Sequence, residues 1–98
     1  MTISKSNENG KLTVAVEGRL DTTTAPELEN ELKTSLDGVT EFVLDFADLS
    51  YISSAGLRVI LSAQKQMNKQ GSMKVVNVGP EIKEIFDVTG FTDILTIE

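Results

Sequence analysis

Two adjacent serines, Ser53 and Ser54, offer the clearest chemistry in the chain because they precede a predicted helix. A serine at that place can cap the helix: its hydroxyl accepts a hydrogen bond from a backbone N–H one turn on, which is worth about 1 kcal/mol. The same place can also accept a phosphate, because a helix N-terminus presents free N–H groups and a partial positive charge. Arg58, four residues after Ser54, is positioned to help neutralise such a phosphate. The residues alone leave both interpretations open.

Gly56 follows in the first turn of the same helix, where a glycine costs about 1 kcal/mol relative to alanine. Two explanations fit this cost: another backbone approaches closely at this point, or the helix packs tightly on the sheet. A phosphoserine nearby would carry a charge of about −1.5 to −2. Such a charge would change what can dock on the surface without unfolding the domain.

Asp45 and Asp48 suggest a second chemistry, a Mg²⁺ site or a phosphoaspartate. A magnesium site needs several carboxylates that converge on one point. Asp48 lies three residues beyond Asp45, in a predicted loop, and no acidic pair follows the earlier strand. We therefore expect no metal, and we expect Asp45 to cap backbone groups where the loop begins. The chain also has no glycine-rich nucleotide motif, so we expect no ATP site and no cofactor.

The composition argues against several classes of protein. A chain of 98 residues forms one domain. Nine Lys and Arg against 15 Asp and Glu give a net charge of −6, which argues against a nucleic acid or an anionic membrane as the main partner. Without Cys or His, the chain has no thiolate nucleophile, no Cys-ligated zinc and no Ser-His-Asp triad. These absences argue against a conventional hydrolase.

The hydropathy of the chain bears on its location. No apolar run approaches the roughly 20 residues of a membrane span. The opening segment, MTISKSNENGK, lacks the apolar core of a signal peptide. We therefore expect a soluble, cytoplasmic protein.

The N-terminal part of the chain is predicted to form a hairpin followed by a helix. Apolar residues alternate with polar or small ones over 12–17, which is typical of a half-buried strand, and Asn9-Gly10 predicts a tight turn to a partner strand over 3–7. Thr24 and Glu27 are spaced as a capping box, with Pro26 in the first turn. A stripe of leucines at intervals of four then predicts a helix to about residue 37; its members are Leu28, Leu32 and Leu36.

The rest of the chain alternates between strands and helices. Residues 42–46 form a nearly unbroken apolar run, as expected of a buried central strand, and a loop over 47–53 leads to a helix that ends before Gly71. A further strand is predicted over 73–78. A short helix then runs from Gly79-Pro80 to Gly90, and residues 94–97 are predicted to form a last edge strand.

This order of elements predicts an α/β domain. Strands that alternate with helices after a hairpin imply a mixed β-sheet with right-handed crossovers, and we expect the helices to pack mainly on one face. Residues 48–58 then lie past the carboxyl end of a buried strand, where binding sites of open α/β sheets usually form. Beside the two serines, we expect Ile52 to be buried, whereas Tyr51 is either a partner contact or an anchor for the loop.

Three segments resemble one known family. The segment LDFADLSYISSAGLRVIL resembles the central motif of bacterial anti-sigma factor antagonists, which are stand-alone STAS domains. EGRLDTTTAPELENEL resembles the second strand and first helix of that family, and NVGPEIKEIFDVTGFTDILTI resembles its last helix and final strand. The resemblance implies a single STAS domain over residues 1–98.

The resemblance also implies a phosphorylation switch. In the family, the unmodified antagonist binds an anti-sigma factor that is a serine kinase, and phosphorylation of the antagonist separates the two proteins. A serine phosphatase restores the binding form, and the released sigma factor is the readout. Ser54 takes the position of the phosphorylated residue. Many members carry Asp immediately before it, where this chain has Ser53. Because Ser53 also has a hydroxyl, it is the second candidate for the phosphorylated residue.

The same resemblance assigns the partner-binding surface. The residues assigned to this surface are Asp21, Ser53, Ser54, Ala55, Gly56 and Arg58. The alternative for Asp21 is a turn residue that flanks the first helix.

Two other functions stay open at this stage. One is a STAS scaffold or ligand-sensing subunit of a stress-signalling or lipid-transport complex, in which the serine only caps the helix. The other is a phosphohydrolase that works through Asp45 and Mg²⁺, which the missing His and the scattered acids argue against.

Overall fold

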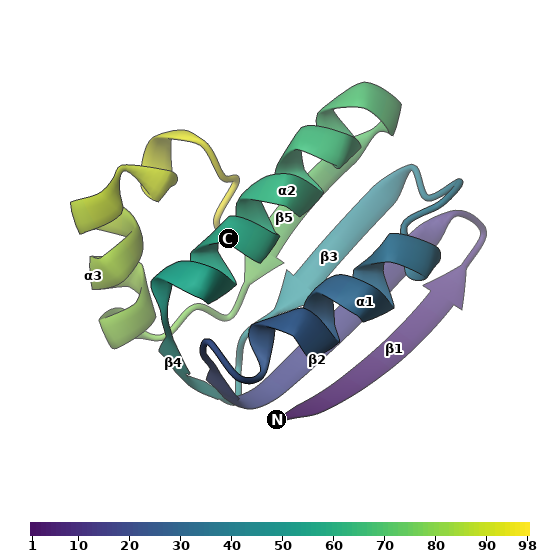
Figure 1. The fold of residues 1–98 in the computed structure, drawn as a ribbon. Coiled ribbons are helices and arrows are strands. Elements are labelled where there is room, and N and C mark those ends of the chain that lie inside the picture. The colour runs from purple at the N-terminus through teal and green to yellow at the C-terminus, as the bar shows by residue number, and fades with distance from the viewer.

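A mixed β-sheet with two helices on one face forms the body of the protein (Figure 1). The computed structural model describes residues 1–98. In chain order the elements are β1 (Thr2–Glu8), β2 (Lys11–Leu20), α1 (Ala25–Ser35), β3 (Glu41–Asp45), β4 (Leu49–Ile52), α2 (Ser54–Gln70), β5 (Ser72–Val76), α3 (Pro80–Thr89) and a 3₁₀ turn (Phe91–Asp93).

The predicted hairpin is confirmed. β1 pairs antiparallel with β2, and the turn between them holds Asn9 at φ 50° and Gly10 at φ 84°. Positive φ at both central residues is what a type I′ turn requires, and Asn-Gly is the sequence that tolerates it best.

β2 is long enough to pair with two later strands on the same side. The sheet order is β1-β2-β3-β5, and β2–β3 and β3–β5 are parallel pairs. The first half of β2, residues 11–15, lies against β3, whereas residues 18–20 lie against β4 in a second parallel pair. The sheet is therefore mixed, as predicted.

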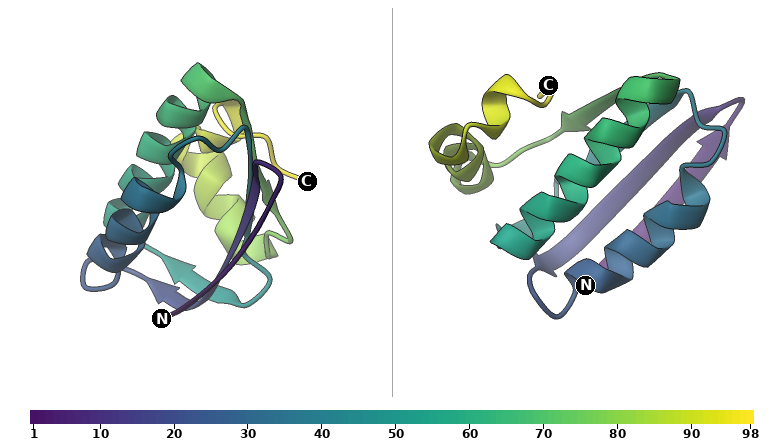
Figure 2. Two further views of the ribbon diagram at one scale, coloured as in Figure 1. Left: turned by 90° about the vertical axis from the view of Figure 1, so that its right-hand side faces the viewer. Right: turned by 45° about the horizontal axis from the view of Figure 1, so that its top comes forward.

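The helices α1 and α2 lie side by side on one face of the sheet, and the edge-on view in Figure 2 shows the two layers. The buried leucines of α1 at positions 28, 32 and 36 confirm the predicted stripe. α3 stands to one side, against β4 and the 3₁₀ turn. Its Phe86 is fully buried between Phe46 and Phe91, with ring centroids 6.5 and 6.3 Å away.

Two predicted elements differ in the structure. The loop expected over 47–53 contains the strand β4, whose four residues are too few to show an alternating pattern. The edge strand expected over 94–97 is reduced to a single bridge between Val75 and Ile97. Val75 donates to Thr96 O at 2.9 Å and accepts from Glu98 N at 2.9 Å, so the C-terminal residues still lie parallel to β5.

Candidate functional site

The ends of β2 and β4 bring the two predicted site segments together. Leu20 and Ile52 are cross-strand partners, and the N–H of Ser53 donates to the carbonyl of Leu20 at 2.9 Å. Asp21 directly follows Leu20, and Ser54 begins α2. The loop before α1 and the start of α2 therefore leave the sheet at the same edge (Figure 1).

The structure separates the roles of the two serines. Ser53 is the N-cap of α2: its backbone is extended, and its Oγ accepts a hydrogen bond from the N–H of Gly56 at 3.4 Å. Ser54 is the first residue of the helix, its side chain is exposed, and its hydroxyl makes no hydrogen bond within the protein. Capping accounts for Ser53 and leaves Ser54 free.

The capping difference predicts different effects of removing each hydroxyl. Ser53→Ala is expected to lower the free energy of unfolding by about 1 kcal/mol, because the Gly56 N–H loses its partner. Ser54→Ala is expected to change it by less than about 0.5 kcal/mol, as for other exposed positions. Urea denaturation of the two variants checks this, and equal losses would contradict the assignment of the cap.

Gly56 permits α2 to pack closely on the sheet, one of the two explanations that the sequence left open. A Cβ at Gly56 would lie 2.7 Å from Leu20 Cγ and 2.9 Å from Ile52 Cγ1, and both of those residues are buried. The burial of Ile52 confirms the prediction. Gly56 was assigned to the partner-binding surface, but it is buried against the sheet. Its role is therefore to set the distance between α2 and the sheet.

The other two assigned positions on α2, Ala55 and Arg58, differ in exposure. Ala55 is half-buried and packs against the core. Arg58 is exposed one turn after Ser54 on α2 and forms no ion pair with the acidic groups of the chain. Of the residues assigned from the motif on α2, Ser54 and Arg58 are the ones whose side chains face solvent.

The predicted capping box at the start of α1 is wrong, and Asp21 takes its place. Thr24 is the N-cap residue but makes no capping hydrogen bond; its Oγ1 donates to Arg19 O at 2.7 Å and accepts from Asp21 N at 2.8 Å. Instead Asp21 Oδ1 accepts from the N–H groups of Thr23 and Thr24 at 3.0 and 3.1 Å, and from the Thr23 hydroxyl at 2.8 Å. Asp21 is thus the turn residue that one interpretation anticipated, and it also borders Ser53.

These hydrogen bonds keep Asp21 charged. The Thr23 hydroxyl and the backbone N–H groups lower the pKa of Asp21 from 3.8 to about 2. Because the native pKa is the lower one, the stabilisation is complete above about pH 4 and disappears as the pH falls to about 2.

The Asp21 carboxyl is expected to titrate in an NMR experiment with a midpoint near pH 2. The free energy of unfolding should fall more steeply between pH 4 and 2 in the unaltered chain than in Asp21→Asn, which has no carboxyl to protonate there. A midpoint near 3.8 would show that the turn does not hold the carboxylate.

Sequence reasoning missed Arg19, which joins Asp21 to Tyr51. The Arg19 guanidinium lies over the Tyr51 ring, 4.2 Å from its centroid, and its Nε is 3.6 Å from Asp21 Oδ2. Tyr51, whose role the sequence left open, is partly exposed and forms this contact on the outer side of β4.

Asp45 has the capping role that was predicted for it. Its Oδ1 accepts from Ala47 N at 2.9 Å and from Asn77 Nδ2 at 3.1 Å, so it fixes the turn after β3. The structure contains no group of three or more acidic side chains that could hold a metal ion. No helix combines the length and the apolar character needed to cross a membrane.

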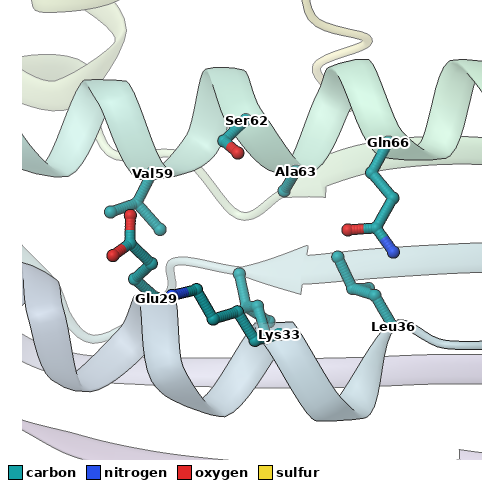
Figure 3. A pocket seen from close by; sticks show the side chains of 8 residues that line it. Glu29, Lys33, Leu36, Val59, Ser62, Ala63 and Gln66 are labelled. Atoms are coloured by element: carbon teal, nitrogen blue, oxygen red, sulfur yellow. The ribbon is translucent and has the colours of Figure 1, made fainter.

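A shallow groove separates α1 from α2 (Figure 3), and Ser54 is not among the residues that line it. Glu29 and Lys33 of α1 face Ser62 and Gln66 of α2 across it, over an apolar floor that includes Leu36. Its volume of about 70 Å³ is small beside the roughly 300–1,000 Å³ of sites for small molecules.

Solved structures with this arrangement define the class of the protein. An anti-sigma factor antagonist from Mycobacterium paratuberculosis is 25% identical, with a TM-score of 0.89 over 98% of this chain and 83% of that one. SpoIIAA in its unphosphorylated form has a TM-score of 0.78 over 99% of this chain and 87% of that one, at 17% identity, which shows the fold alone. The fold is that of the anti-sigma factor antagonists.

Sequence comparison gives the family. The STAS domain model matches residues 2–98, and the chain belongs to the STAS domain family. BtrV of Bordetella bronchiseptica is 35% identical over 99 residues, covering 99% of this chain and 85% of that protein. The anti-sigma-B factor antagonist of Bacillus subtilis is 34% identical over 94 residues, covering 95% of this chain and 85% of that protein. The suspected family is confirmed.

Proposed function

We propose that the protein is an anti-sigma factor antagonist whose binding is switched at Ser54. In its unphosphorylated form it binds an anti-sigma factor that is also a serine kinase, and the sigma factor held by that partner is released. The kinase then transfers the γ-phosphoryl group of ATP to Ser54 Oγ, with loss of the hydroxyl proton and departure of ADP. A serine phosphatase restores the binding form by hydrolysis.

The free hydroxyl of Ser54 is the observation that carries this proposal. A residue that a partner's active site modifies must be exposed and must not hold the fold together. Ser54 meets both conditions, since it faces solvent and the capping of α2 rests on Ser53. The same distinction favours Ser54 over Ser53 as the acceptor, because the Ser53 hydroxyl is already engaged by the N–H of Gly56.

The start of α2 tolerates a phosphate without unfolding. The first turn of the helix supplies free N–H groups and the positive end of the dipole, and Arg58 lies one turn on. Two solved forms of SpoIIAA support this view of the fold: this chain superposes on the unphosphorylated form with a TM-score of 0.78 and on the phosphorylated form with 0.77.

The phosphate changes the docking surface and leaves the fold intact. A complex that covers Ser54 must remove water from its side chain, and a phosphate adds bulk and about two negative charges there. An unpaired charge in a desolvated interface costs several kcal/mol, which is enough to separate the proteins.

The names of two relatives support an anti-sigma factor as the partner. The Bacillus subtilis relative, 34% identical, is named for antagonism of an anti-sigma-B factor, and the described antagonist from M. paratuberculosis shares the fold. Regulatory binding, with no catalysis by this chain, is the activity that fits both. A cytoplasmic location follows from the proposal, because sigma factors act there.

A reconstituted exchange tests the proposal. The unphosphorylated chain is mixed with the anti-sigma factor and sigma factor of the same organism, and the complexes are separated by size-exclusion chromatography. Free sigma factor should appear with the unaltered chain and with Ser54→Ala, and preincubation with ATP should abolish release for the unaltered chain only. No release by either chain would favour a STAS scaffold or sensing subunit that does not switch.

A further inference from the structure

We propose that Arg19 and Tyr51 form a docking patch beside Asp21 that binds the anti-sigma factor through a carboxylate and an apolar pocket of that partner. The inference rests on the proposed function and extends it, because neither residue belongs to the helix that carries the switch.

A β-bulge sets the two side chains on one face. β2 and β4 change register between Gly18 and Arg19, so that Gly18 opposes Leu49 while Arg19 opposes Tyr51. Ser50 falls between the two pairs, and its Oγ donates to Gly18 O at 3.0 Å. Bulges of this kind commonly re-aim side chains next to functional sites.

The patch is held in place before any partner arrives. Arg19 lies over the Tyr51 ring at 4.2 Å, and its Nε is 3.6 Å from Asp21 Oδ2. Asp21 is itself fixed by Thr23 and Thr24 through its other oxygen. A preorganised side chain loses less freedom on binding, so more of its contact energy appears as affinity.

The patch adjoins Asp21, at the sheet edge that carries the switch. Arg19 and Tyr51 immediately precede Leu20 and Ile52 in their strands, and Leu20 and Ile52 pack under Gly56 of α2, so Arg19 and Tyr51 point to the opposite face of these strands. Asp21 joins the two sides, because it follows Leu20, whose carbonyl accepts the N–H of Ser53, and it pairs with Arg19. A partner that contacts both Ser54 and Asp21 therefore reaches Arg19 and the Tyr51 ring that it covers.

The chemistry of the patch indicates what it binds. Tyr51 is the single tyrosine of the chain and presents an aromatic ring at 37% exposure, while the Arg19 side chain is 61% exposed. Asp21 approaches Arg19 at Nε, which leaves the terminal N–H groups of the guanidinium to a carboxylate of the partner. Tyrosine and arginine are also the residues that most often dominate binding energy at protein interfaces.

Alanine variants of the patch test the inference, with affinity for the anti-sigma factor measured by calorimetry. Tyr51→Ala is expected to weaken binding about 30-fold, the effect of an interface hot spot, and Arg19→Ala about 10-fold. Tyr51→Phe keeps the ring and should stay within about 3-fold of the unaltered chain. In phosphorylation assays Tyr51→Ala should raise KM and leave kcat unchanged, because the variant affects docking and not transfer.

Val88→Ala is the matched control. Val88 is 80% exposed on α3, and its removal should change affinity by less than about 2-fold. If Tyr51→Ala and Arg19→Ala both bind like Val88→Ala, the inference is wrong while the proposed function stands. If the unaltered chain does not bind an anti-sigma factor at all, the proposed function fails and the docking patch with it. Thermal melting of Arg19→Ala, which removes an exposed side chain, should match that of the unaltered chain.

Discussion

Phosphorylation of Ser54 is expected to weaken binding to the anti-sigma factor by about 100-fold or more. Ser54 is exposed, and phosphorylation would place a group of about two negative charges on the proposed docking surface, which must lose its water on binding. Arg58 can neutralise one of these charges; a desolvated charge left without a partner costs about 3–5 kcal/mol, and each 1.4 kcal/mol is tenfold in affinity. Calorimetric titration of the phosphorylated and unphosphorylated chains measures the difference directly.

Substitutions at Ser54 should bracket this effect. Ser54→Ala is expected to bind like the unaltered chain and to keep that affinity in the presence of ATP. Ser54→Asp carries about half the charge of a phosphate, so its affinity should fall between those of the two forms. Ser62→Asp, which adds the same charge at an exposed serine of α2 two turns further on, should stay within about 2-fold. Equal losses of affinity from Ser54→Asp and Ser62→Asp would show that net charge, and not the position of Ser54, weakens binding.

Gly71→Ala is expected to lower the free energy of unfolding by about 3 kcal/mol or more. Gly71 follows α2, and a Cβ at this position would lie 1.9 Å from Thr40 O and 2.6 Å from Thr40 C. Those atoms belong to the backbone, so they cannot rotate away as a side chain would. Thr40 O also accepts the N–H of Ser72 at 3.0 Å, and this hydrogen bond starts the pairing of β5 with β3. Overpacking of this kind usually costs about 1–3 kcal/mol, and a backbone obstacle places this case at the upper end or beyond.

Gly79→Ala is the matched control for this prediction. Gly79 precedes α3 with φ −70°, and a Cβ there would meet no atom within 4 Å. Its free energy of unfolding should stay within about 0.5 kcal/mol of the unaltered chain in the same urea titrations. A Gly71→Ala variant as stable as Gly79→Ala would contradict the close approach of Gly71, just after α2, to the backbone of Thr40, just before β3.

The parts of the fold that could be predicted are those whose signals are local. Asn9-Gly10 adopts positive φ at both residues in any hairpin, and a row of leucines at intervals of four makes one face of a helix wherever it packs. Residues 42–44 are apolar and buried in succession, so both faces of the strand are covered, as a strand between neighbours requires. Each of these patterns lies within a few residues, so the sequence alone was sufficient.

β4 could not be predicted because its stability comes from a distant strand. Its four residues pair with the last residues of β2, about 30 positions earlier, and β2 extends beyond β3 to meet them. The C-terminal residues behave similarly, since their pairing with β5 is reduced to one bridge, between Val75 and Ile97. Short elements of this kind depend on register between remote segments, which no local pattern reports.

The features of the candidate site also divide into those with a local sequence signal and those that depend on contacts between distant segments. The serine pair before α2 was predicted from a motif, and the structure adds that Ser53 is the cap and Ser54 the free hydroxyl. The capping box at Thr24 was wrong because Asp21, three residues earlier, accepts the Thr24 N–H from a turn, and the Thr24 hydroxyl bonds to Arg19 O and Asp21 N instead of the helix. The contact of Arg19 with Tyr51 depends on the bulge between β2 and β4, and so it could be seen only in three dimensions.

Mass spectrometry of the modified chain tests the central claim most directly. The chain is incubated with the anti-sigma kinase of its own organism and ATP, and the phosphorylated peptide is sequenced. A single phosphoryl group on Ser54, absent from Ser54→Ala and retained in Ser53→Ala, is the predicted result. A phosphoryl group on Ser53, or a chain left unmodified by every such kinase of that organism, would contradict the assignment of the free hydroxyl as the switch.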